Sequence, residues 1–307
     1  MKRFKNILVV YNDVPGADDA LTQGAALAME NDARLTVVDI CPIGYRSPEF
    51  IAEREKRLRR TVRCLHLEGV KDADAFVLIG DDYEEVIRQV VRAKHDMVIA
   101  SSAGGSPLKN ALYGSFAIAL MRKCPGPVWI VKPGQSAVYR RVLAAVDIGI
   151  ENSATDPLSA KIIEMASSLA SGHDAEFHVL HAWDVTGKDA DTLSSEVPDP
   201  TRVRLLDNHE AARRDVLQAL LEKHVVGEVS PVAHLPRGTP IWEIAGAVDS
   251  REIDVVVMGT ASRSGLAALF LGNAAETILE AARCGVMTVK PDGFEAPIAL
   301  ERDQEVA

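Results

Sequence analysis

Short apolar runs alternate along the chain with longer stretches in which apolar and polar residues mix at helical spacing. The runs that predict strands include KNILVVYND at 5–13, ARLTVVDI at 33–40 and a last run at 286–290. The stretches between such runs, for example ADDALTQGAALAME at 17–30, predict helices. Uninterrupted apolar strands of about four to six residues are typical of a parallel sheet covered on both faces, so the pattern indicates an α/β fold.

The pattern occurs twice. In the first copy Asn12 follows the first apolar run, and in the second copy Asp147 follows the matching run RRVLAAV. Each copy ends on a cysteine and a final strand that closes with Val-Lys-Pro, at 124–133 and at 284–291. This internal repeat predicts two βαβαβαβαβ units. Their predicted limits are 1–133 for the first repeat, 134–139 for the linker, 140–291 for the second repeat and 292–307 for a polar tail. We also expect the proline-bearing segment 186–200 to be a mobile loop.

Composition narrows the classes of protein that fit this pattern. The 307 residues, 47% of them hydrophobic, suffice for two medium domains with full cores. A net charge of -10 argues against a nucleic-acid partner, and we interpret the basic stretch 53–63 as a solvated helix face. No run approaches the roughly 20 apolar residues of a membrane span, and the N-terminal run is too short for a signal peptide. Four cysteines without paired spacing indicate reduced thiols, so we expect a cytoplasmic protein.

Each copy has a loop between a strand and a helix, where α/β proteins often hold a phosphate. In the loop at 259–273 nine residues separate Ser262 from Gly272, and in the loop at 101–115 nine residues separate Gly104 from Gly114. A glycine lets backbone N–H groups approach a phosphate without a Cβ in the way. The equal spacing predicts that both loops keep a similar shape, although their side chains differ.

These loops, the duplicated first strands and the closing strand after a cysteine resemble those of tandem universal stress proteins. The stretch GTASRSGLAALFLGNAAETILEAARCGVMTVKP at 259–291 is most similar to the E group of that family, and the resemblance extends over roughly 1–291. It implies that each half is a doubly wound, five-stranded parallel sheet of the adenine nucleotide alpha-hydrolase-like type, with strand order 3-2-1-4-5. It also implies that the last strands, at 127–131 and 286–290, pair the halves as an internal pseudo-dimer.

The resemblance also implies where a nucleotide would bind. Nucleotide-binding members have G-x-x-G, nine residues and then G-S/T, with an Asp at the end of the first strand and backbone after the second strand that contacts adenine. The second half keeps the Asp but departs from the loop pattern at Ser262 and Asn273, and the first half departs at Asn12 and Ser101. The implied site in the second half comprises Asp147, Ala182, Gly259, Thr260, Ser262, Arg263, Gly272 and Asn273. A weaker site in the first half comprises Asn12, Ile40, Ser101, Gly104, Gly114 and Ser115.

Two functions fit these observations. The first is a cytoplasmic stress-response protein that binds or senses an adenine nucleotide, ATP or AMP with accompanying Mg²⁺, and has at most slow ATP hydrolysis. The alternative keeps the fold but binds a non-nucleotide, amphipathic ligand or a protein partner, which the apolar run LAALFLG at 266–272 would suit. A dedicated enzyme is disfavoured, because the chain has neither a P-loop nor a G-x-S-x-G elbow. Whether the chain also forms a homodimer stays open.

Three histidines in the second half, His178, His181 and His234, raise the question of a metal site. His178 and His181 are three residues apart, so a strand running through both would point them to opposite faces. His178 and His234 could be neighbours on adjacent strands. We expect half-buried histidines with backbone partners and no bound metal.

Overall fold

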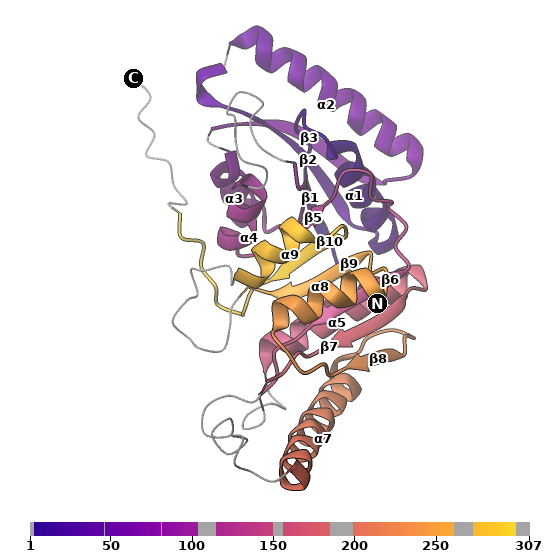
Figure 1. Ribbon diagram of the computed structural model, residues 1–307. Helices are drawn as coiled ribbons and strands as arrows, with labels where there is room; N and C mark the ends of the chain where they lie inside the picture. Colours follow the sequence, from indigo (N-terminus) through magenta and orange to yellow (C-terminus); the bar gives the residue numbers. More distant parts are fainter. Residues whose placement is uncertain are drawn as a thin grey trace.

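A single ten-stranded sheet runs through the whole molecule, with helices on both of its faces (Figure 1). The computed structural model describes residues 3–45, 47–80, 82–103, 115–149, 156–184, 199–260 and 273–298. Most of both glycine loops, most of the segment 186–200 and the end of the tail therefore lie outside the described residues.

The elements alternate as the hydrophobic pattern predicts. The first half contains β1 (Asn6–Val10), α1 (Ala17–Asn31), β2 (Arg34–Cys41), a short 3-10 helix (Ile43–Tyr45), α2 (Pro48–Glu68), β3 (Asp72–Ile79), α3 (Asp82–Ala93), β4 (Met97–Ser101), α4 (Ser115–Lys123) and β5 (Val128–Val131). The second half contains β6 (Arg141–Ala145), α5 (Pro157–His173), β7 (Glu176–Leu180), α7 (Asp199–His224), β8 (Pro231–His234), α8 (Pro240–Ser250), β9 (Val255–Gly259), α9 (Asn273–Ala281) and β10 (Gly285–Val289).

The strand order confirms the predicted topology. The order β3-β2-β1-β4-β5-β10-β9-β6-β7-β8 contains 3-2-1-4-5 once in each half, and all pairs within a half are parallel. The two predicted five-stranded sheets are thus two parts of one continuous sheet. The registers also match, because Val10 pairs with Val38 in the first half as Ala145 pairs with Leu180 in the second. This match makes Ile40 the counterpart of Ala182.

The halves meet along one antiparallel strand pair, β5 with β10, as an internal pseudo-dimer requires. Trp129 lies directly opposite Met287, and these two residues occupy the same position in the two repeats. Both side chains are fully buried. The two halves therefore meet at a pair of large, fully buried apolar residues, whose burial stabilises the joined sheet.

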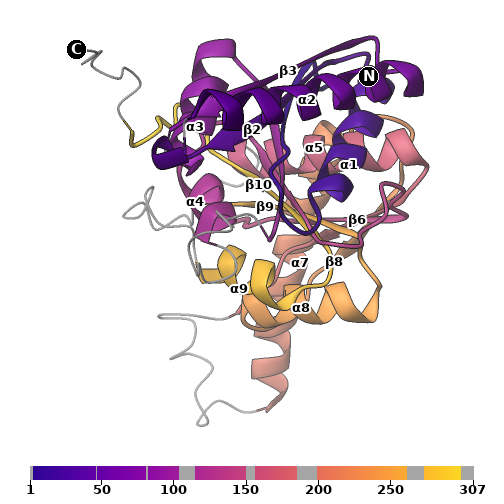
Figure 2. The ribbon, with the colours of Figure 1, turned by 90° about the horizontal axis from the view of Figure 1, so that it is seen from above.

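Two apolar layers cover the two faces of the sheet. One layer joins the strands to α1, α2, α5 and α7, and the other joins them to α3, α4, α8 and α9. Figure 2 shows α3 and α4 on the opposite side of the sheet from α1. Because both faces are covered, the strands are apolar on successive residues, which explains the uninterrupted runs in the sequence.

Two lysines, the buried Lys290 and the partly buried Lys132, link the halves further. Lys290 Nζ donates to the Arg122 carbonyl near the end of α4 at 2.9 Å, and Lys132 Nζ donates to the Leu279 carbonyl near the end of α9. A lysine from each half thus satisfies the helix terminus of the other half, where carbonyls lack intrahelical partners. Burial lowers the pKa of Lys290 to about 8.

Candidate functional site

A cavity of about 520 Å³ lies at the carboxyl edge of the second half. It is formed where β6 lies between β7 and β9, the point at which the strand order reverses. Such switch points are where open α/β sheets usually bind ligands. Its lining combines the ends of these strands with residues from the starts of α5, α8 and α9: Ala145, Val146, Asp147, Asp156, Pro157, Leu158, Ser159, Ile162, Leu180, Ala182, Pro240, Ile244, Met258, Gly259, Thr260, Ala275, Pro291 and Asp292.

Three carboxylates line this cavity, and two of them are engaged by neighbours. Asp156 caps α5, accepting from the Leu158 N–H at 3.3 Å and from the Ser159 hydroxyl at 2.6 Å. Asp292 forms an ion pair with Lys161 at 2.9 Å. The exposed Asp147 carboxylate accepts no hydrogen bond from any described residue. Asp147 is therefore the acceptor that remains available to a ligand at the cavity.

The backbone beside Asp147 offers a donor as well. Ala182 follows the end of β7 and lines the cavity. The neighbouring His181 and Trp183 N–H groups donate to carbonyls at 3.0 and 3.1 Å, but the Ala182 N–H donates to no described residue. An acceptor at Asp147 and a backbone donor at Ala182 thus border the same apolar cavity.

Gly259 packs closely against a side chain of α5. A Cβ at this position would lie 2.9 Å from Leu158 Cδ2 at the start of α5, and its backbone has no positive φ. The next residue, Thr260, is buried and its N–H donates to the Val289 carbonyl at 3.2 Å. The sequence pattern alone did not single out Leu158, because its contact with Gly259 joins residues 101 positions apart.

Of the residues that the resemblance assigns to the phosphates, the structure describes Asn273 but not Ser262, Arg263 or Gly272. Asn273 is the first residue of α9, as predicted from its position after Gly272. Ala275, in the first turn of α9, lines the cavity, so the N-terminus of this helix is directed to the same edge of the sheet.

In the first half, the residues that correspond to this site form hydrogen bonds with one another or with nearby backbone groups. Asn12 Oδ1 accepts from the Ile40 N–H at 3.2 Å, so the counterparts of Asp147 and Ala182 bind each other. Ser101 donates its hydroxyl to the Pro15 carbonyl at 2.6 Å and accepts from the Ala103 N–H at 3.2 Å. Ser115 is the first residue of α4, and Gly104 and Gly114 lie outside the described residues.

A buried ion cluster at the first edge was not predicted from the sequence. Asp39 is fully buried, and its two carboxylate oxygens each accept from an arginine of α2, Arg54 and Arg57, at 2.5 Å. The sequence pattern predicts a solvated helix face for the basic stretch that contains these arginines. For these two residues that prediction is wrong, because β2 places the carboxylate of Asp39 beneath α2. In the second half the position of Asp39 holds His181.

The histidines are arranged partly as predicted. His178 and His234 are neighbours on β7 and β8, with His178 Nδ1 3.1 Å from His234 Nε2, whereas His181 lies beyond the end of β7. His181 Nδ1 lies 3.2 Å from the Val146 carbonyl oxygen. Over the described ranges no group of three or more His, Cys, Asp or Glu residues is placed to hold a metal ion. No helix in those ranges is long and apolar enough to cross a membrane.

Comparison with known proteins identifies the family to which this duplicated fold belongs. The profile of the Universal stress protein family matches the chain twice, at residues 3–132 and 138–290. The chain belongs to the universal stress protein family. Universal stress protein E from Photorhabdus laumondii is 27% identical over 327 residues, covering 99% of this chain and 100% of the relative. Universal stress protein E from Escherichia coli strain K12 is 27% identical over 224 residues, covering 73% of this chain and 69% of the relative.

Solved structures show the same tandem fold in other universal stress proteins. One from Pseudomonas aeruginosa, described as a putative universal stress protein, has a TM-score of 0.73 at 22% identity and covers 95% of each chain. A universal stress protein from Archaeoglobus fulgidus has a TM-score of 0.62 at 17% identity and covers 92% of this chain and 98% of its own. At these identities the likeness concerns the fold.

Proposed function

We propose that the second half of this universal stress protein binds an adenine nucleotide at the carboxyl edge of its sheet and thereby senses ATP or AMP in a stress response. One observation carries the proposal. The exposed Asp147 carboxylate and the Ala182 N–H both lie at a cavity of about 520 Å³, and neither forms a hydrogen bond with a described residue. That volume lies within the usual range for small-molecule sites. A carboxylate suits the ribose hydroxyls, and a backbone N–H suits a ring nitrogen of adenine.

The remaining parts of a nucleotide would find matching chemistry nearby. Leu158, Ile162, Ile244 and Met258 offer apolar surface to the base and the sugar. The phosphates would extend toward the N-terminus of α9 at Asn273, where free N–H groups and the helix dipole favour negative charge. We assign the contacts of Ser262, Arg263 and Gly272 to the same end, and Mg²⁺ would accompany ATP.

A second candidate function is favoured by the polarity of the lining. Among its described residues the lining contains no Lys or Arg, and most of its side chains are apolar. An amphipathic ligand without phosphates, whose hydroxyl or amine donates to Asp147, would match this surface. In that case the chain would keep the family fold with a changed ligand.

Calorimetric titration of the full-length protein with ATP, with and without Mg²⁺, tests the proposal. We expect saturable binding that Asp147→Ala weakens at least roughly tenfold, because a charged hydrogen-bond acceptor contributes on the order of 1.5–3 kcal/mol. The matched variant in the other half, Asn12→Ala, should leave the affinity within about twofold. Absence of binding heat for ATP and AMP, or equal losses in both variants, would contradict the proposal and favour the amphipathic ligand.

A further inference from the structure

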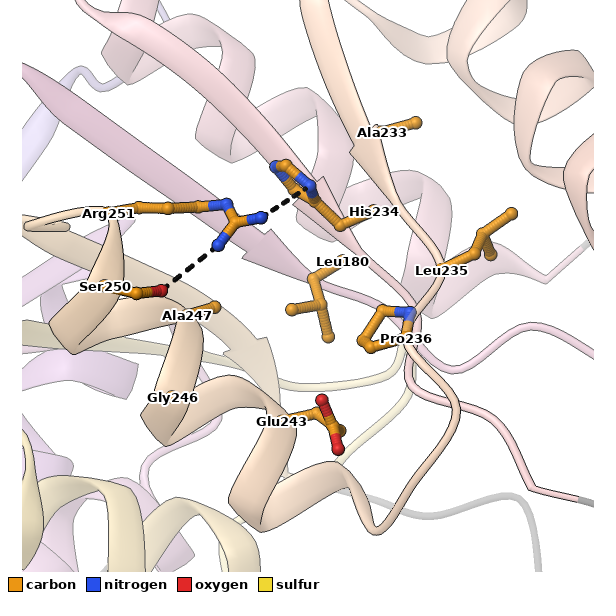
Figure 3. A pocket seen from close by; sticks show the side chains of 10 residues that line it. All are labelled: Leu180, Ala233, His234, Leu235, Pro236, Glu243, Gly246, Ala247, Ser250 and Arg251. Carbon is orange, nitrogen blue, oxygen red and sulfur yellow. Dashed lines mark hydrogen bonds between the residues drawn. The ribbon is translucent and has the colours of Figure 1, made fainter.

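A second cavity in the same half, of about 470 Å³, lies between the edge strand β8 and helix α8. Figure 3 shows Arg251 reaching toward His234 at one end, Glu243 near Pro236 at the other, and Leu180 between them. Apolar atoms of Leu180 and Ala247 are part of its wall. A groove with an apolar centre and a cationic end can hold a small ligand in one orientation.

At one position of the cavity wall the second half has a glycine where the first half has a large side chain. Gly246 of α8 is the counterpart of Arg88 of α3, since both follow the paired glycines Gly80 and Gly238 by eight residues. In the first half Arg88 is only 10% exposed and forms ion pairs with Glu85 at 2.6 Å and Glu84 at 3.0 Å. A Cβ added at Gly246 would meet no atom within 4 Å. The second half therefore has open space at Gly246, where the first half has a largely buried arginine.

The histidines at the cationic end form a directed chain of hydrogen bonds. Arg251 Nη2 lies 3.4 Å from His234 Nδ1, and a guanidinium can only donate. His234 Nδ1 therefore accepts, so its proton is on Nε2 and is donated to His178 Nδ1 at 3.1 Å. The proton of His178 is then on Nε2, which faces a Glu176 oxygen 3.5 Å away.

Both imidazoles in this chain are neutral near pH 7. Burial, followed by the charge of Arg251 and then by repulsion from His178 when that ring is also protonated, lowers the pKa of His234 to about 4. Burial also lowers the pKa of His178, against the opposing effect of Glu176 on β7, and Arg251 and Arg141 of β6 add to the lowering. The positive charge at this end of the cavity thus belongs to Arg251.

Arg251 has no acidic partner among the residues that the structure describes. The nearby carboxylates Glu176 and Glu252 both form ion pairs with Arg141, at 3.3 and 2.9 Å. Within the described ranges the guanidinium donates to the Ser250 hydroxyl, at 3.1 Å, and to His234, and to no other group. Its remaining N–H groups are available to an anion, for which a planar guanidinium is well suited.

A metal ion fits this end poorly. A cation bound between His178 Nδ1 and His234 Nε2 would force the His234 proton onto Nδ1, directly against the donating Arg251. The guanidinium would also repel the cation. The arrangement is therefore suited to an anion.

We propose that this cavity binds a small carboxylate with an apolar body, its carboxylate on Arg251 and the Ser250 hydroxyl and its body against Leu180 and Ala247. The site is independent of the proposed nucleotide site, although Leu180 borders both cavities.

NMR titration of the full-length protein with benzoate tests this proposal. We expect saturable shifts at His234, which lines the cavity beside Arg251. Arg251→Gln should weaken binding at least roughly tenfold, and Arg140→Gln, which removes another exposed arginine of the same half, should leave it within about twofold. Gly246→Arg, which copies the first half and places an arginine beside Glu243, should abolish binding.

Inorganic phosphate and Asp147→Ala complete the experiment. Phosphate cannot use the apolar wall, so it should bind at least roughly tenfold more weakly than benzoate. Asp147→Ala should leave benzoate binding unchanged, which separates this site from the nucleotide site. Absence of saturation by benzoate, equal affinity for phosphate, or unchanged binding in Arg251→Gln would overturn the proposal.

Discussion

The two halves of this chain share their strand order and register, yet they treat the carboxyl edge of the sheet differently. In the first half Asn12 binds the Ile40 N–H, Ser101 binds Pro15 and Ala103, and Asp39 is held by two arginines. In the second half the Asp147 carboxylate and the Ala182 N–H form no hydrogen bond with a described residue. Polar groups at this edge that hydrogen-bond to each other stabilise the fold. Polar groups that have no partner within the protein are available to a ligand.

A reciprocal exchange of small and large residues accompanies this difference. In the first half Ser101 ends β4 and faces Gly16, where an added Cβ would lie 2.7 Å from the serine hydroxyl oxygen. In the second half Gly259 ends β9 and faces Leu158, where an added Cβ would lie 2.9 Å from the leucine side chain. In each half, the end of this strand meets the start of the helix that follows the neighbouring strand, α1 or α5. One side chain fills this contact in each half, and it comes from the strand in the first half and from the helix in the second. A glycine in such a loop can therefore reflect packing as well as ligand approach.

The largest effect is expected where the halves are joined. Trp129→Ala should lower the free energy of unfolding by about 3–5 kcal/mol, because it empties a fully buried site opposite Met287. Trp242, which is 72% exposed, supplies the control, and Trp242→Ala should change stability by no more than about 0.5 kcal/mol. Urea unfolding followed by circular dichroism measures both. Equal losses in the two variants would mean that the strand pair does not hold the halves together.

The ion cluster of the first half should come next. Asp39→Ala leaves Arg54 and Arg57 without their shared acceptor and should cost about 2–3 kcal/mol in urea unfolding. Asp74→Ala is the control, because Asp74 forms an exposed ion pair with Arg34 in the same half. This variant should lower the free energy of unfolding by less than about 1 kcal/mol. If Asp39→Ala cost no more than Asp74→Ala, the buried cluster would not distinguish this edge from its counterpart.

The third prediction uses the pH dependence of stability. His234 has a folded-state pKa of about 4, below its unfolded value near 6.5, so its contribution is fully present above pH 6.5 and is lost as the pH falls toward 4. Glu30 acts oppositely, since burial raises its pKa to about 7 and its contribution is lost as the pH rises from about 4.5 to 7.

The counterpart of His234 in the first half is Phe76, so His234→Phe isolates the histidine. Relative to this variant, the unmodified chain should lose about 1.5 kcal/mol between pH 6.5 and pH 4, a value reduced by solvent screening at this half-buried position. Thermal unfolding at several pH values measures the difference. Parallel stability curves for the two proteins would contradict it.

The smallest effect concerns the matched edge residues. Asn12→Ala removes the acceptor of the Ile40 N–H and should cost about 1 kcal/mol of stability. Asp147→Ala removes a side chain that accepts no hydrogen bond from the described residues, and it should leave stability within about 0.5 kcal/mol. Urea midpoints of the two variants, measured without ligand, test this contrast. A larger loss in Asp147→Ala would show that its carboxylate supports the fold.

Much of the architecture could be predicted from local pattern and repetition. Apolar runs such as ILVV in β1 predicted strands because a strand that is covered on both faces needs apolar side chains at successive positions. The resemblance to tandem universal stress proteins supplied the strand order and the pairing of the last strands. The resemblance also implied one site for Asp147, Ala182 and Gly259, and these residues line one cavity. The roles of Ser262, Arg263 and Gly272 stay predictions.

The sequence by itself determined the repeated elements, because hydrophobic periodicity and equal spacing are properties of neighbouring residues. Only the tertiary structure decided which polar groups at the two edges are already engaged. The bond from Asn12 to Ile40, the packing of Leu158 against Gly259 and the space left at Gly246 all depend on elements that are distant in the chain. Whether a donor or acceptor is free depends on where its neighbours lie in space, and two repeats with matching registers can therefore differ in what they leave for a ligand.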